Sequence, residues 1–136
     1  MTTAVALDGS ALFAILKGES GADACREALR AADHVLVSAG SLAEMLIVAS
    51  RRGLLAELEH MIELVRPEVV PLTAARARAA AAAYRRWGKS FHDAKLNICD
   101  SFAYVLAEEI RCPLLFVGSD FAQTDFVSAL DRSSPH

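Results

Sequence analysis

The alternation of short apolar runs with longer helical patterns is the feature that most constrains how this chain can fold. Four brief aliphatic runs have the character of buried strands, at residues 4–7, 35–37, 69–70 and 114–117. Apolar residues recur between them with helical spacing: Leu42, Leu46 and Ala49; Leu54, Leu58, Met61 and Val65; and Cys99, Phe102, Leu106 and Ile110. This order predicts an α/β fold around a mostly parallel sheet, with functional sites at the carboxyl ends of the strands.

Size and composition predict one folded, soluble domain. The 136 residues are 54% hydrophobic and 23% charged, which supports a core and argues against disorder. No apolar run approaches the roughly 20 residues of a membrane span, and the N-terminus lacks a secretory pattern. Three widely spaced cysteines, Cys25, Cys99 and Cys112, argue against a disulfide framework or a thiolate zinc site. A cytoplasmic protein that has no contact with a membrane is therefore expected.

The net charge of −3 leaves nucleic-acid binding open. Phosphate recognition normally uses a basic face, but an active site built of carboxylates would itself make the sum negative. Local clusters therefore carry more information than the total.

Four acidic residues stand near predicted strand ends or helix starts, and each also has a structural explanation. Asp8 follows the first strand and could cap the next helix, and Asp120 follows the last strand and fits a surface turn. Glu44 ends a capping-box pattern that begins at Ser41, although its neighbours are mostly apolar. Asp100 follows Asn97 by three residues, which is again a capping-box spacing, yet it shares a helical row with Leu96, Ala103 and Ala107.

The arrangement of these acids suggests a shared cation. The carboxyl edge of a parallel sheet would bring such positions into one region, where four carboxylates would repel one another and their pKa values would rise. A divalent ion removes that penalty. An all-oxygen donor set favours Mg²⁺, with Mn²⁺ as a substitute, over zinc.

The sequence also resembles the VapC-type toxins of bacterial toxin–antitoxin pairs, which are PIN-domain ribonucleases. The likeness is strongest over residues 5–126. It is carried by residues 7–12 (LDGSAL), 41–44 (SLAE), 87–89 (WGK), 96–104 (LNICDSFAY), 114–121 (LLFVGSDF) and 121–125 (FAQTD). It implies a single PIN-like domain over residues 1–136, with 127–136 as a C-terminal tail. The implied fold is a three-layer α/β/α sandwich with four or five short strands.

The resemblance also implies roles for particular residues. Asp8, Glu44 and Asp100 match the three acids that hold the metal, Asp120 matches a more variable fourth acid, and Ser10 matches a hydroxyl that orders the first acid. There are departures from the family pattern. Gly9 replaces a usual Thr, which is expected to loosen the turn after Asp8, and Ser119 stands where many relatives have a second acid. Cys99 and Ser101 exchange the small residues that usually flank the third acid.

The implied activity is a Mg²⁺-dependent endoribonuclease in which metal-activated water cuts the phosphodiester bond, leaving 5′-phosphate and 3′-hydroxyl ends. The alternative is a catalytically weakened PIN-like domain that only binds RNA or protein. The densest basic stretch is either a solvated helix end or a rim that guides RNA phosphates: Arg85, Arg86, Lys89, His92 and Lys95.

The resemblance further implies a VapB-type antitoxin as partner and a homodimer. The apolar stripe Leu54, Leu58, Met61, Ile62 and Val65 is typical of core. Part of it, with Leu12, Phe13 and Leu16, could instead line the groove that receives an antitoxin helix.

Two other acid-based folds fit less well. A haloacid-dehalogenase-type phosphatase needs a second Asp two residues after the first, where this chain has Ser10. A receiver domain needs an Asp pair after the first strand, and none is present there.

Overall fold

Four short parallel strands form a sheet in the part of the chain that the computed structural model describes, namely residues 2–88, 97–118, 125 and 128–132. Residues 131 and 132 are described by their backbone alone. The strands and helices, in chain order, are β1 Ala4–Leu7, α1 Gly9–Leu16, α2 Ala22–Ala31, β2 His34–Ser38, α3 Ala39–Arg52, α4 Leu55–Val65, β3 Glu68–Val70, α5 Ala74–Trp87, α6 Ile98–Ile110, β4 Leu114–Leu115 and α7 Ala129–Arg132.

The order of the strands creates a place for a site. The sheet runs β3-β2-β1-β4, and every neighbouring pair is parallel. The chain moves outward from β1 to β3 and then returns to the other side of β1 with β4. The direction of winding therefore changes between β1 and β4, and in α/β sheets such a switch point leaves a crevice at the carboxyl ends of the strands.

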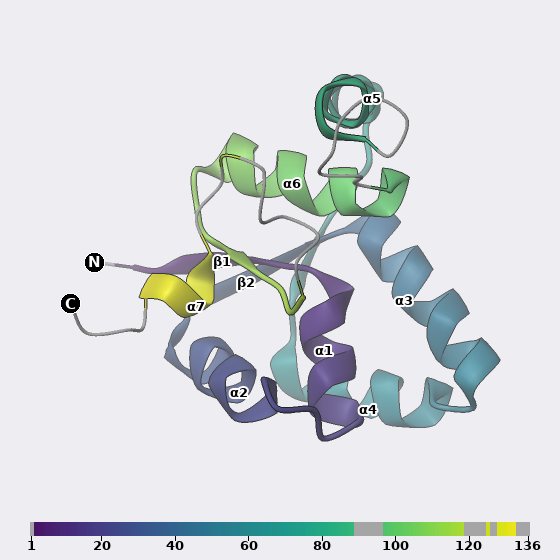
Figure 1. The fold of residues 1–136 in the computed structure, drawn as a ribbon, viewed down its shortest axis with the longest axis vertical. Coiled ribbons are helices and arrows are strands. Elements are labelled where there is room, and N and C mark those ends of the chain that lie inside the picture. The colour runs from purple at the N-terminus through teal and green to yellow at the C-terminus, as the bar shows by residue number, and fades with distance from the viewer. Residues whose placement is uncertain (1, 89–96, 119–124, 126–127, 133–136) are drawn as a thin grey trace.

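The sheet lies between two helical layers, as Figure 1 shows. Successive side chains of β1 pack into two hydrophobic cores on opposite faces of the sheet. Ala6 packs toward α5 and α6, whereas Val5 and Leu7 pack toward α1, α3 and α4. Leu114 and Leu115 of β4 divide in the same way. The α/β/α sandwich with a parallel sheet is thereby confirmed.

Two elements differ from the sequence prediction. The last strand was expected over 114–117, but β4 ends at Leu115. The ladder ends there because its partner strand β1 ends at Leu7, which pairs with Leu115, and the backbone N–H of Val117 donates instead to Oγ of Ser10 at 3.0 Å. Helix α2 was not predicted: Ala22, Cys25, Ala28 and Leu29 recur with helical spacing, but only the small Ala22 and Cys25 are buried.

Two further findings concern the thiols and the helices. Cys25, Cys99 and Cys112 are all free thiols. Within the described residues, no helix has both the length and the apolar character needed to cross a bilayer.

Candidate active site

Asp8 is fixed at the switch point of the sheet. It follows β1 directly, and its backbone N–H donates to the carbonyl of Leu115 in the adjacent β4 at 3.0 Å. Its side chain caps α1, with Oδ2 accepting from the N–H of Ser10 at 3.1 Å. The residue is 7% exposed. The helix-cap interpretation of Asp8 is therefore confirmed, and it places a buried carboxylate at the carboxyl edge of the sheet.

Ser10 connects the start of α1 to the chain after β4. Its Oγ accepts from the backbone N–H of Val117, while its own N–H donates to Asp8. Ser10 thus contacts both sides of the switch point, Asp8 through its backbone and Val117 through its hydroxyl.

Gly9 is buried against α3. A Cβ added to Gly9 would lie 2.5 Å from Cγ of Met45, so α3 approaches the first turn of α1 too closely for a side chain. The expectation that Gly9 loosens this turn is not what the structure describes. Here glycine provides room for the Met45 side chain, which is itself 1% exposed.

Glu44 has no capping role. The N-cap of α3 is Ser38, whose Oγ accepts from the N–H of Gly40 at 3.2 Å, and Ser41 already lies inside the helix. The capping-box interpretation of Ser41 and Glu44 is therefore wrong, because the helix begins a turn earlier than that pattern requires. Glu44 is half-buried on a helix that packs against both α1 and α6.

Asp100 closes a capping box at the start of α6. Its N–H donates to Oδ1 of Asn97 at 2.8 Å, and the N–H of Asn97 donates to Oδ2 of Asp100 at 3.1 Å. Asp100 is 6% exposed, and Ala103 and Ala107 on the same row are buried, as predicted. Capping does not prevent metal binding, because each carboxylate oxygen can accept more than one bond.

The Cys99 thiol is influenced by all three acids. Burial raises its pKa most, and a hydrogen bond with Glu44 and the charges of Glu44, Asp100 and Asp8 raise it further, to about 12. A thiolate at this position would be repelled by carboxylates from α3, α6 and the end of β1. Helix α3, which carries Glu44, packs against both α1 and α6, so the three acids lie on elements that contact one another. Sequence reasoning placed Cys99 in an apolar helical pattern and among the flanks of Asp100, and it missed the influence of Glu44 and Asp8 on this thiol.

The acids are near one another without forming a closed set of ligands. In the described part of the chain, no three His, Cys, Asp or Glu side chains form a group that could hold a metal ion as they stand. Asp120, the fourth predicted acid, lies outside the described residues. The donor chemistry nevertheless suits Mg²⁺, since Asp8, Glu44 and Asp100 supply only carboxylate oxygens and two of the three are buried.

The predicted basic rim is described only in part. Arg85 is exposed, and Lys89, His92 and Lys95 lie outside the described residues. Arg86 forms an ion pair with Asp125 at 3.4 Å, and its guanidinium carbon lies 4.6 Å from the centre of the Trp87 ring.

Asp125 also binds α6. It accepts a hydrogen bond from the hydroxyl of Tyr104, a residue that lies one helical turn after Asp100 and is 2% exposed. Burial and this hydrogen bond raise the pKa of Tyr104 to about 12. The contact between Asp125 and Tyr104 was not predicted, because nothing in their spacing of 21 residues indicates it.

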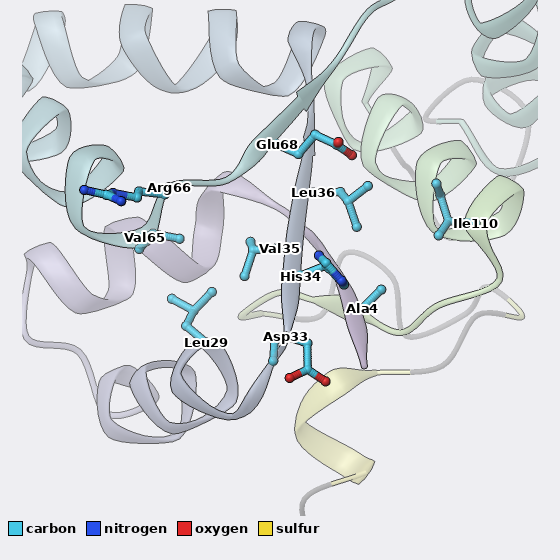
Figure 2. Close-up of a pocket in the computed structure, with 11 residues that line it drawn as sticks. Ala4, Leu29, Asp33, His34, Val35, Leu36, Val65, Arg66, Glu68 and Ile110 are labelled. Carbon is cyan, nitrogen blue, oxygen red and sulfur yellow. The ribbon is translucent and has the colours of Figure 1, made fainter. Parts of the chain in front are cut away.

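Two hollows among the described residues lie away from Asp8 and Asp100. A cavity of about 360 Å³ is lined by the first residues of three strands, Ala4, His34 and Glu68, and therefore opens at the amino edge of the sheet, opposite Asp8 (Figure 2). A second hollow, of about 330 Å³, lies beside α4 and includes Met61 and Val65 of the predicted apolar stripe. Leu58 of that stripe is core, as its spacing indicated.

Comparison with known proteins agrees with this geometry. The sequence pattern described as "PIN domain" matches residues 5–127. Ribonuclease VapC42 of Mycobacterium tuberculosis is 38% identical over 124 residues, which cover 88% of this chain and 94% of that protein. Ribonuclease VapC28 of the same species is 41% identical over 130 residues, with 93% and 98% covered.

Solved structures have the same fold. M. tuberculosis VapC20, described as a sarcin-ricin loop cleaving toxin, superposes with a TM-score of 0.72 at 17% identity, covering 90% of this chain and 96% of that one. A chain of a toxin-antitoxin complex from Klebsiella pneumoniae gives a TM-score of 0.67 at 17% identity, with 90% and 94% covered. With its parallel sheet, its acids at the switch point and relatives of this similarity, the chain belongs to the PIN-domain family and, within it, to the VapC group.

Proposed function

We propose that this chain is the toxin of a toxin–antitoxin pair and acts as a metal-dependent endoribonuclease. The proposed ligands of the ion are Asp8, Glu44 and Asp100, with Asp120 as a fourth acid, and Mg²⁺ is the proposed ion, which Mn²⁺ can replace. The observation that supports the proposal is the placement of the acids in a VapC-like fold: Asp8 is buried at the switch point, Asp100 is buried at the start of α6, and Glu44 lies on α3, which packs against both α1 and α6.

The chain's own residues have distinct tasks in this proposal. Asp8 and Asp100 are held by helix caps, so their carboxylates are oriented before any ligand arrives. Glu44 is not engaged in a cap and can turn toward the other two. Ser10 steadies Asp8 through its backbone N–H. The ion, when bound, supplies the positive charge that acidifies a water nucleophile and stabilises the charge that develops on the phosphate.

The partners follow from the relatives. We propose RNA as substrate, with phosphates guided by Arg85, Arg86, Lys89, His92 and Lys95, and a VapB-type antitoxin as inhibitor. Arg86 forms an ion pair with Asp125, so an RNA phosphate that binds Arg86 would have to displace Asp125. A homodimer and a cytoplasmic location are part of the same proposal.

Cleavage of RNA by matched variants tests the catalytic assignment. Asn at positions 8 and 100 keeps a cap acceptor and removes the charge, so Asp8→Asn and Asp100→Asn should both fold. Each should lower the rate of RNA cleavage by at least about 100-fold, which is the scale of loss when one charged catalytic group is removed. Asp23→Asn, which disturbs only an exposed ion pair with Arg26 on α2, is the control. Wild-type cleavage should also stop in EDTA and return with Mg²⁺. A fully active Asp100→Ala protein would contradict the assignment.

The alternative is a PIN-like domain that binds RNA or protein without cutting. It is favoured by one observation, that no closed group of three ligands exists among the described residues. RNA that binds to the wild type and stays intact with Mg²⁺ present would support this alternative over the nuclease.

A further inference from the structure

The hydroxyl of Ser41 is a buried polar group that lacks a protein partner. Ser41 is 2% exposed, and its Oγ has no hydrogen-bond partner within the described part of the structure. Serine hydroxyls in the same helix and in α6 do have partners. In α3, Oγ of Ser50 donates to the carbonyl of Leu46 at 2.8 Å, and in α6, Oγ of Ser101 donates to the carbonyl of Asn97 at 3.3 Å. Because buried hydroxyls are normally paired, the exception at Ser41 requires an explanation.

Contacts on either side of Ser41 define the direction in which it points. Gly40 lies against the ring of Phe102 in α6, and Met45 lies against Gly9 in α1. Each residue of an α-helix is rotated by about 100° about the helix axis from the one before. Measured from Gly40, Glu44 therefore lies at about 40°, Ser41 at about 100° and Met45 at about 140°. Glu44 and Ser41 therefore both point into the sector between the first turns of α6 and α1.

That sector contains the acids. Asp100 is in the first turn of α6, and Asp8 immediately precedes Gly9. Ser41 and Met45 are four residues apart and share a face of α3, so Ser41 lies on the row whose Met45 packs against the start of α1. Asp8 is the acid toward which this row leads, because Met45, one turn further along it, lies against Gly9, the residue that follows Asp8.

We propose that Ser41 is a positioning residue of the acid site, whose hydroxyl donates a hydrogen bond to the Asp8 carboxylate when the acids close around a divalent ion. The inference rests on the proposed function. The proposed hydrogen bond explains why the Ser41 hydroxyl is buried without a partner in a structure whose three carboxylates do not yet form a group that could hold a metal ion. Hydrogen bonds to ligating carboxylates orient them, and removal of such outer partners commonly weakens metal binding by about 10-fold or more.

Titration calorimetry with Mn²⁺ on the full-length chain tests the inference without any measurement of activity. Ser41→Ala should bind Mn²⁺ about 10-fold more weakly than the wild type. Ser41→Thr, which keeps the hydroxyl, should recover most of the affinity. Ser50→Ala is the matched control, because it removes a serine hydroxyl from the same helix that already has a backbone partner, and its affinity should be unchanged.

Thermal unfolding in EDTA separates positioning from simple packing. Loss of an unpaired buried hydroxyl should leave the unfolding temperature of metal-free Ser41→Ala unchanged or raise it. Unchanged Mn²⁺ affinity in Ser41→Ala would overturn the inference while leaving the proposed function intact. A weaker affinity accompanied by a matching loss of stability in EDTA would overturn it as well, since a packing defect would then explain both. A wild-type protein that binds no Mn²⁺ would instead defeat the proposed function itself.

Discussion

At the residue scale, helix capping and a metal site use the same positions in this chain. Asp8 and Asp100 are both caps, so the structural explanation and the functional one are not alternatives for them. A cap holds a carboxylate in one orientation at a helix start, where the free N–H groups also favour negative charge. Glu44 differs, because the cap belongs to Ser38 and the acid lies inside the helix.

The capping role of Asp8 can be measured separately from its charge. Asp8→Ala removes the acceptor for the N–H of Ser10 and should lower the free energy of unfolding by about 1 kcal/mol. Asp8→Asn keeps an acceptor and should cost much less. Denaturant unfolding of the metal-free proteins compares them, and equal losses in the two variants would mean that the cap contributes little.

Gly9 and Met45 should behave as a coupled pair. Restoring the Thr that relatives usually have places a Cβ against Cγ of Met45, so Gly9→Thr should destabilise the fold by about 1–3 kcal/mol. In a Met45→Ala background the same change should cost at least about 1 kcal/mol less, since contacting residues are not additive. Additive costs in this double-mutant cycle would show that α3 adjusts freely around the new side chain.

At the scale of elements, the sequence predicted those whose burial follows a simple period and missed the others. The strand at residues 4–7 and the helix that carries Leu54 to Val65 are strongly patterned, and both are present. Helix α2 was missed although its core-facing residues recur with helical spacing, because most of them are small. The early end of β4 follows from its partner strand: β1 ends at Leu7, opposite Leu115, and no local pattern within residues 114–117 reveals that.

The contact between α5 and α6 includes an ion pair whose contribution to stability depends on pH. The guanidinium of Arg76 donates to both carboxylate oxygens of Glu109, at 3.0 and 2.9 Å. These hydrogen bonds, and then the charge of Arg76, lower the pKa of Glu109 below its ordinary value. A carboxyl with a lowered folded-state pKa stabilises the fold above its unfolded-state pKa, and this stabilisation disappears as the pH falls through the lowered value.

Glu109→Gln should therefore reduce stability slightly at neutral pH and have no effect well below the lowered pKa. Glu109 is exposed and Arg76 is half-buried, so the loss at neutral pH should be small and should shrink further in high salt. Glu108→Gln, at the adjacent exposed position, is the control. A loss in Glu109→Gln that is the same at both pH values would contradict an electrostatic origin.

At the scale of the whole molecule, the candidate site exists only because the sheet brings distant segments together. Residues 8, 44 and 100 are separated by 36 and 56 positions, and the parallel order β3-β2-β1-β4 places the starts of α1, α3 and α6 at one edge. The alternating pattern of strands and helices was enough to predict that edge. It could not give the closeness of α3 to Gly9, the enclosure of Ser41 or the place of Cys99, because each depends on side chains that meet only after the layers pack.

The most direct test of this account is a crystal structure of the full-length chain with Mn²⁺, using the anomalous signal of manganese to locate the ion. The account predicts a peak bounded by the carboxylates of Asp8, Glu44 and Asp100, with oxygen ligands at about 2.0–2.3 Å. A peak that avoids these three side chains, or three carboxylates that stay apart in crystals soaked with Mn²⁺ at a concentration that supports RNA cleavage, would contradict it.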